Sequence, residues 1–202
     1  MHNKKNCILA QETDQSLFLL KYNLLVMIKI HNHIENKIYD DFISEFENLI
    51  NQNIVEKSET TINIISSKMI DSFCELKQTL KTDYGSSPYC FCYNIPDCEI
   101  KHVIIVNEEL CKTMNFSRSD HYAALLHEIG HFWAIQEYGK NILDNNISLS
   151  EYLSDKFVLK FDMGKELISA LQKMSASGFY TPDYCKNAID WRIDRLTDKL
   201  PL

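Results

Sequence analysis

Residues 127–131 read His-Glu-Ile-Gly-His, an H-E-x-x-H motif inside a segment whose sequence predicts a helix. Residues four apart lie on one face of a helix, so the imidazoles of His127 and His131 can point at the same place. Glu128 follows His127 directly and can hold a water molecule beside it. Two neutral imidazoles and a nearby carboxylate are what a catalytic zinc site requires. The motif therefore predicts a Zn²⁺ site, with Glu128 as the general base.

The surrounding residues favour a helix that contains the whole motif. Residues 117–120 supply capping side chains and an acid for the first turn, and Gly139 is typical of a helix end. Gly130 costs about 1 kcal/mol relative to alanine inside a helix. A small residue there lets another segment approach between the two histidines. A chance match to the motif is the competing explanation, and this context argues against it.

A zinc site needs a third protein ligand, and the next predicted helix offers two carboxylates. Glu151 and Asp155 are four residues apart and share a face, so one can bind the metal while the other hydrogen-bonds a ligand histidine. Glu151 has an alternative role, because Ser148 to Glu151 matches a capping box in which the carboxylate only satisfies backbone N–H groups. We expect Glu151 to be the third ligand, with Asp155 as the alternative.

On these residues the chain resembles the gluzincin group of zinc metallopeptidases. H-E-x-x-H followed by a helix with E-x-x-x-D is similar to M48-type peptidases and minigluzincins, while the ligand spacing and the Val-Asn-Glu-Glu-Leu segment are also similar to ImmA/IrrE-type metallopeptidases. The resemblance covers about residues 100–200 and departs at Ser154, where M48-type chains usually carry alanine. It implies a zincin-like fold, zinc on His127, His131 and Glu151, and Asp155 hydrogen-bonded to a ligand histidine.

Residues near the C-terminus extend the resemblance and suggest further roles. Residues 192–196 are similar to the R-I-x-x-L stretch that closes such families. Peptide hydrolysis needs a donor for the oxyanion of the tetrahedral intermediate. Tyr180, Tyr184 and Arg192 lie where gluzincin folds return to the cleft, so they are candidates for that donor. Arg192 is equally suited to be a buried partner of Asp155 or Glu47.

Length and charge limit the alternatives. A chain of 202 residues fits one domain, predicted over residues 33–202, with an apolar N-terminal extension over 1–32 packed on it. The net charge of −7 gives no electrostatic case for nucleic-acid binding. The apolar run from Leu17 to Ile30 is short for a membrane span and does not resemble a secretory signal. We therefore expect a buried helix or strand and a cytoplasmic protein, with an interfacial membrane helix as the alternative.

Seven cysteines are many for a protein in a reducing compartment. Cys90, Cys92 and Cys98 cluster, and the odd total without an export signal indicates free thiols. Two alternatives stay open: the cluster could form half of a second metal site, or a thiol could reach the zinc and silence it.

The sequence pattern predicts an α+β fold, a small sheet backed by helices with a helical C-terminal half. We expect a helix over 33–57, a strand over 60–66, a helix over 67–81 and a hairpin formed by 89–93 and 100–106. The strand at 100–106 leads into the motif helix. We therefore expect it to form the sheet edge along which a peptide substrate binds.

These features together favour a zinc-dependent peptidase that acts on a peptide or protein. A regulatory protein that retains a zincin fold but acts by contact with a partner is the main alternative. Hydrolysis of a non-peptide amide is a third. The intact Glu128 argues against a purely structural zinc, since such a site needs no base. Neither the substrate nor the oligomeric state follows from the sequence.

Overall fold

A computed structural model describes residues 27–54, 59–72, 87–95, 100–178 and 183–199. Within these residues the fold is α+β, with a four-stranded mixed sheet in the order β1-β2-β4-β3. The strands are β1 (Ile28–Asn32), β2 (Thr60–Ser66), β3 (Tyr89–Cys92) and β4 (His102–Val106). The first three in that order are parallel, and β3 pairs antiparallel with β4. The α+β class predicted from the sequence is confirmed.

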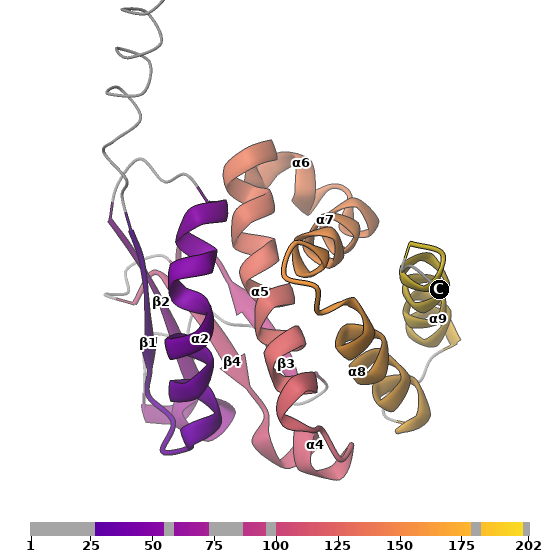
Figure 1. The fold of residues 1–202 in the computed structure, drawn as a ribbon, viewed down its shortest axis with the longest axis horizontal. Helices are drawn as coiled ribbons and strands as arrows, with labels where there is room; N and C mark the ends of the chain where they lie inside the picture. The colour runs from indigo at the N-terminus through magenta and orange to yellow at the C-terminus, as the bar shows by residue number, and fades with distance from the viewer. Residues whose placement is uncertain (1–26, 55–58, 73–86, 96–99, 179–182, 200–202) are drawn as a thin grey trace, which may run out of the picture.

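Helices cover one face of the sheet and then continue away from it (Figure 1). Helices α2 and α5 lie over the strands, and α7 and α8 pack on α5. The helices are α2 (Lys37–Asn53), α4 (Glu108–Thr113), α5 (Arg118–Tyr138), α6 (Lys140–Asp144), α7 (Ile147–Leu159), α8 (Gly164–Ala176) and α9 (Asp183–Thr197), with the 3₁₀ helix η1 at Ser67–Ser72. Among the described residues, none of these helices is both long enough and apolar enough to cross a membrane.

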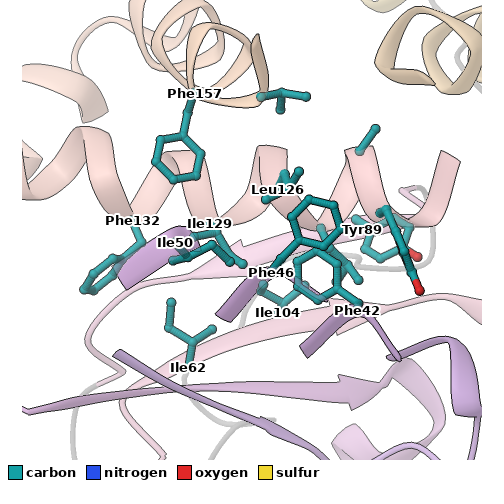
Figure 2. Close-up of a cluster of buried hydrophobic side chains, with 14 of the residues drawn as sticks. Phe42, Phe46, Ile50, Ile62, Tyr89, Ile104, Leu126, Ile129, Phe132 and Phe157 are labelled. Atoms are coloured by element: carbon teal, nitrogen blue, oxygen red, sulfur yellow. The ribbon is translucent and has the colours of Figure 1, made fainter. Parts of the chain in front are cut away.

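The main core lies between the sheet and the pair α2 and α5. Figure 2 shows Ile62 and Ile104 of the sheet together with Phe42 and Phe46 of α2 and Leu126 of α5. The apolar residues of α2 recur every three to four positions and so share one buried face. The helix begins at Lys37, after the Asn36 cap, rather than at residue 33. Residues 28–32, which precede the helix, form strand β1 of the sheet.

The N-terminal boundary differs from the sequence-based division. Residues 28–32, assigned to the extension, form β1 and pair with β2 from Ile28 to Asn32. The last residues of the apolar run from Leu17 to Ile30 therefore belong to β1. Residues 1–26 lie outside the described residues. The predicted helix over 67–81 begins as η1, and residues 73–81 of that prediction are likewise outside.

The prediction that residues 100–106 form the sheet edge is wrong. The strand β4 lies between β2 and β3, so both of its sides are used in pairing. The hairpin itself is as predicted, with Tyr89 opposite Val106 and Cys92 opposite Val103. Because β4 already pairs with the parallel strand β2, its hairpin partner β3 takes the outer position beside α5.

Helix α5 carries the H-E-x-x-H motif through the middle of the molecule. Its N-terminus has a capping box between Ser117 and Asp120, and it ends at Gly139, whose φ of 84° favours glycine. Apolar residues occur all round the helix, and Leu125, Ile129 and Phe132 are fully buried. A helix that is apolar on every side must be covered on every side. The sheet covers one face of α5, and α7 and α8 cover another.

Helix α7 begins earlier than a capping box at Ser148 requires. Its N-cap is Asn146, whose side chain accepts a hydrogen bond from the Leu149 amide. Glu151 therefore lies inside the helix, beyond the capping positions. This start removes the alternative role in which Glu151 only satisfies backbone N–H groups.

Candidate metal centre

The two motif histidines each hold one ring nitrogen in a hydrogen bond with α7. His127 Nδ1 lies 2.9 Å from Asp155 Oδ1. His131 Nδ1 lies 3.0 Å from Ser150 Oγ. A histidine whose Nδ1 is held in this way presents Nε2 as a ligand atom, which is how imidazoles are oriented at zinc sites. Both Nε2 atoms therefore stay directed at a common third group.

That third group is the Glu151 carboxylate. Glu151 Oε2 is 3.3 Å from His127 Nε2, and Oε1 is 3.5 Å from His131 Nε2. Two atoms bound tetrahedrally to zinc at about 2.0–2.2 Å lie roughly 3.3–3.6 Å apart. The three side chains offer ligand atoms that all lie within 4.8 Å of one another. His127, His131 and Glu151 can thus hold a metal ion together.

Arg192 of α9 reaches the centre, and its Nη2 lies 3.2 and 3.3 Å from the two ring nitrogens of His127. Its Nη2 donates to Asp155 Oδ1 at 2.6 Å and its Nε donates to Asp155 Oδ2 at 3.0 Å. Its Nη1 lies 2.7 Å from Glu151 Oε2. The role as a buried partner of Asp155 therefore has direct geometric support. Glu47, the other partner considered, instead accepts a hydrogen bond from the Ile30 amide.

The remaining oxyanion candidates cannot be placed in the centre. Tyr180 lies outside the described residues, and so does the side chain of Tyr184 at the start of α9. Arg192 is committed to two carboxylates. Its role as an oxyanion donor stays a prediction, and the structure adds nothing in its favour.

The charge at the centre depends on its protons. With both imidazoles neutral and Glu128 ionised, the carboxylates of Glu128, Glu151 and Asp155 face a single guanidinium and two negative charges remain, which protons on His127 and Glu128 can cancel. Burial raises the pKa of the Glu151 carboxyl, but Arg192 and His127 outweigh it and hold that pKa well below its usual range. A divalent cation would balance this set.

The two imidazoles have opposite proton affinities. Burial and Arg192 lower the pKa of His127, but its hydrogen bonds to Asp155 and Glu151 raise it overall to about 9. Burial is the largest effect on His131 and lowers its pKa to about 4. His127 is thus protonated at neutral pH because the carboxylates of Asp155 and Glu151 stabilise the imidazolium. A bound metal ion would replace that proton.

Glu128 is buried next to the ligands without belonging to them. The side chain is 8% exposed, and burial raises its pKa to about 7. The backbone N–H of Phe91 on β3 acts in the opposite direction, by hydrogen bonding to the carboxylate. A carboxyl group with a pKa near neutrality can both accept and return a proton, which is what a general base in hydrolysis has to do.

The close approach between α5 and α7 explains Gly130. A Cβ atom built on Gly130 would lie 2.8 Å from Ser154 Cα and 2.9 Å from the Ser154 carbonyl oxygen. Only glycine allows the backbones to approach this closely. Ser154 is fully buried, and its hydroxyl donates to the Ser150 carbonyl at 3.0 Å. That bond shows how a hydroxyl is accommodated where the resembling chains usually carry alanine.

Sequence reasoning missed two contributors to the centre. Ser150 orients His131, and Phe91 sends a backbone N–H to Glu128. Ser150 could have been found as the neighbour of Glu151, since a hydroxyl beside a ligand is well placed to reach another. The Phe91 contact has no signal in side-chain chemistry, because any residue supplies the N–H.

The cysteines do not add a second group of ligands in the part of the chain that the structure describes. Cys90, Cys92 and Cys111 are thiols and not disulfide partners, and Cys98 lies outside the described residues. Within the described ranges, the group of three or more metal-type side chains is His127, His131 and Glu151. Contact with Cys92 and burial raise the pKa of the Cys90 thiol far above its usual range, which disfavours the thiolate that a metal needs.

Comparison with protein-family models, with curated proteins and with solved structures gave no match. The assignment of a function therefore depends on the geometry and chemistry of the centre.

Proposed function

We propose that this protein is a zinc-dependent peptidase with a zincin-like fold. The observation that carries the proposal is the spacing of His127 Nε2, His131 Nε2 and the Glu151 carboxylate, at 3.3 and 3.5 Å, beside the buried Glu128. A structural zinc site is usually closed by four protein ligands. Three ligands with an adjacent buried carboxylate suit a hydrolytic site instead.

A bound zinc ion would supply Lewis acidity, lowering the pKa of a coordinated water and polarising the scissile carbonyl. The protein side chains do the rest. Glu128 accepts a proton at its carboxylate and later donates that proton to the leaving amine. Asp155 and Ser150 fix the ring orientation of His127 and His131. Arg192 holds Asp155 and Glu151 in place and offsets part of their charge.

The substrate backbone is expected to lie along β3 rather than β4. Of the two outer strands of the described sheet, β1 already has its outward amides occupied by α2. Asn51 Oδ1 accepts from the Ile28 amide at 2.6 Å, and Glu47 Oε1 accepts from the Ile30 amide at 2.8 Å. The outward Phe91 amide of β3 also has a side-chain partner, but that partner is Glu128, so this edge runs beside the candidate metal ligands. An extended peptide added to β3 would therefore pass the base and the metal ligands.

The Glu128→Gln variant tests the proposal. Glutamine keeps the size of the side chain but accepts no proton, so the variant should keep zinc and lose at least about 10²-fold in cleavage rate. Peptides from a digested host proteome serve as substrates, and new N-termini are counted by mass spectrometry. Glu137→Gln is the matched control, because Glu137 is exposed on the same helix.

The outcomes separate catalysis from binding by contact. Cleavage by the wild type and by Glu137→Gln, but not by Glu128→Gln, supports the peptidase. If the zinc-loaded wild type produces no more new N-termini than Glu128→Gln, the proposal is wrong. The regulatory protein that acts by contact then becomes the better account.

A further inference from the structure

A cavity of about 410 Å³ opens beside the metal centre, between the end of α5, helix α6 and the start of α7. This volume is near the lower end of the range for small-ligand sites, roughly 300–1,000 Å³. It suits one large side chain. The residues that line it are Ile135, Lys140, Leu143, Asp144, Ile147, Ser150 and Glu151.

The cavity shares two residues with the metal centre. Glu151 is the third ligand of the centre, and Ser150 holds the Nδ1 atom of His131. Ile135 follows His131 by four positions and so lies on the same face of α5. A group in the cavity would therefore sit next to a peptide bond that is bound at the metal.

The lining is mixed, with three aliphatic residues beside Lys140, Asp144, Ser150 and Glu151. Ile135, Leu143 and Ile147 supply the apolar part, and Ile147 is 68% exposed although it is a large aliphatic residue. Lys140 and Asp144 form an ion pair with each other across one turn of α6. Because these two charges are paired and the Glu151 carboxylate is held by Arg192, each charged group of the lining already has a partner, and the cavity favours an uncharged side chain.

The direction of β3 places the cavity on the path of a bound peptide. Tyr89 at its start contacts His121 near the beginning of α5, and Tyr93 just beyond its end contacts Gln136. The strand therefore follows α5 from its N-terminal part towards its C-terminal part, past Glu128. Successive residues of an extended peptide advance about 3.3 Å, so a residue near the scissile bond reaches the level of Ile135.

We infer that this cavity is a specificity pocket that receives a large apolar side chain, aliphatic or aromatic, next to the scissile bond of the substrate. The inference rests on the proposed peptidase function. It narrows the substrate class to peptides with such a residue at one fixed position from the cleaved bond. Burial of an apolar side chain in the pocket strengthens substrate binding. One methylene more or less changes the preference between two substrates by about tenfold or more.

The cleavage profile of a peptide library tests the pocket. The wild type should favour leucine, isoleucine, methionine or phenylalanine at one position by about tenfold or more over alanine, lysine and aspartate. Ile147→Trp fills the cavity and should shift the preference towards small residues. Ile147→Asp places a charge at its mouth and should favour lysine or arginine there. Ile142→Trp and Ile142→Asp are the controls, since Ile142 is 57% exposed on α6 and does not line the cavity.

A binding measurement keeps the test independent of turnover. Zinc-loaded Glu128→Gln protein is titrated by calorimetry with one library peptide and with its alanine counterpart at the selected position. The alanine peptide should bind about tenfold more weakly, and this difference should disappear with Ile147→Trp.

The failures of the two proposals differ. If the wild type cleaves peptides without an apolar preference, or both Ile147 variants keep the wild-type profile, the pocket is wrong and the peptidase stands. If Lys140→Ala alone abolishes cleavage and only C-terminal residues are released, the cavity recognises a carboxylate and the inference is overturned. If neither wild type nor Glu128→Gln cleaves any peptide, both proposals fail.

Discussion

Two buried clusters on α5 both combine carboxylates with a cationic side chain, but they differ in the ratio of negative to positive groups. Near the start of the helix, Asp120 is 1% exposed and accepts hydrogen bonds from the Ser117 amide at 2.6 Å and from the Lys173 ammonium at 2.5 Å. At the candidate metal centre, the carboxylates of Glu151 and Asp155 pair with Arg192 of α9, which takes the place that Lys173 of α8 has in the first cluster.

The difference between the clusters lies in what remains unbalanced. The Asp120 cluster pairs one carboxylate with one ammonium group and a complete capping box, so it closes on itself. The candidate metal centre has three carboxylates for one guanidinium, and the Nε2 atoms of its two imidazoles lie beside the Glu151 carboxylate. Buried charge is costly unless it is paired, so a group with more carboxylates than cations has to take up protons or bind a metal ion. Variants of the candidate metal centre should therefore change the zinc content, and variants of the Asp120 cluster should change the free energy of unfolding.

The largest effect is expected for the ligands themselves. Glu151→Ala removes a ligand atom, so zinc content should fall from about one per chain to near zero. The unfolding free energy of the metal-free protein should change by less than about 1 kcal/mol, because Asp155 still pairs with Arg192. Elemental analysis and urea unfolding measure the two quantities. Glu137→Ala, exposed on α5, is the control that should keep zinc. A Glu151→Ala protein with full zinc content would remove Glu151 from the ligand set.

Asp120→Ala should give the opposite pattern. It removes a capping contact and leaves Lys173, which is 30% exposed, without its carboxylate, at a cost of about 2–3 kcal/mol in unfolding free energy. Zinc content should not change. The exposed pair of Lys68 and Glu109 supplies the control, since water screens this pair and Glu109→Ala should leave the urea midpoint nearly unchanged.

The effect of Asp120 should also depend on pH. Burial raises the pKa of this carboxyl, but Lys173 and Ser117 outweigh it, so the pKa in the folded protein is lower than its usual 3.8. The carboxylate therefore stabilises the fold fully above about pH 4, and that contribution is lost as the pH falls through the folded pKa. The difference between wild type and Asp120→Ala should shrink from pH 7 to pH 3. A constant difference over this range would mean that the ion pair contributes nothing.

An intermediate effect is expected for Asp155, which contacts both the candidate ligand His127 and the Arg192 guanidinium. Asp155→Asn keeps a hydrogen bond to His127 but removes the charge, so zinc affinity should fall about 10–100-fold without emptying the site. Competition with a chromophoric chelator measures the affinity. Complete loss of zinc in Asp155→Asn, together with retention in Glu151→Ala, would exchange the roles of the two carboxylates.

The smallest effect is expected where the two helices meet. Gly130→Ala should raise helix propensity by about 1 kcal/mol, but its Cβ would meet the Ser154 backbone at 2.8 Å. We expect a net loss of about 1–2 kcal/mol and weaker zinc binding, because α5 and α7 carry different ligands. Ser154→Ala, on the other side of the contact, should stay within about 1 kcal/mol. A Gly130→Ala protein that is more stable than wild type would contradict the close approach.

Local patterns predicted the elements that carry the centre. The apolar period of α2, the caps of α5 and the four-residue spacing of His127 and His131 are local properties, and each is reproduced. Glu151 and Asp155 share a face of α7 as expected, and Gly130 marks a close helix contact. These predictions depend only on residues within one or two helical turns.

What the sequence did not predict depends on pairing between distant segments. The position of β4 inside the sheet follows from its partner β2, which lies some forty residues earlier. The Asn146 cap competes with Ser148 for the start of α7, and only the preceding turn decides between them. The contact of Phe91 with Glu128 involves a backbone group, which every residue has, so no motif marks it.

Zinc-edge X-ray absorption of the purified wild-type protein tests most directly the claim that α5 and α7 hold a catalytic zinc. The account predicts about one zinc per chain, four ligands that are all nitrogen or oxygen at about 2.0–2.2 Å, and an imidazole contribution from two histidines. Sulfur ligands at about 2.3 Å would place the metal on the cysteines, and a protein that retains no zinc would contradict the centre altogether.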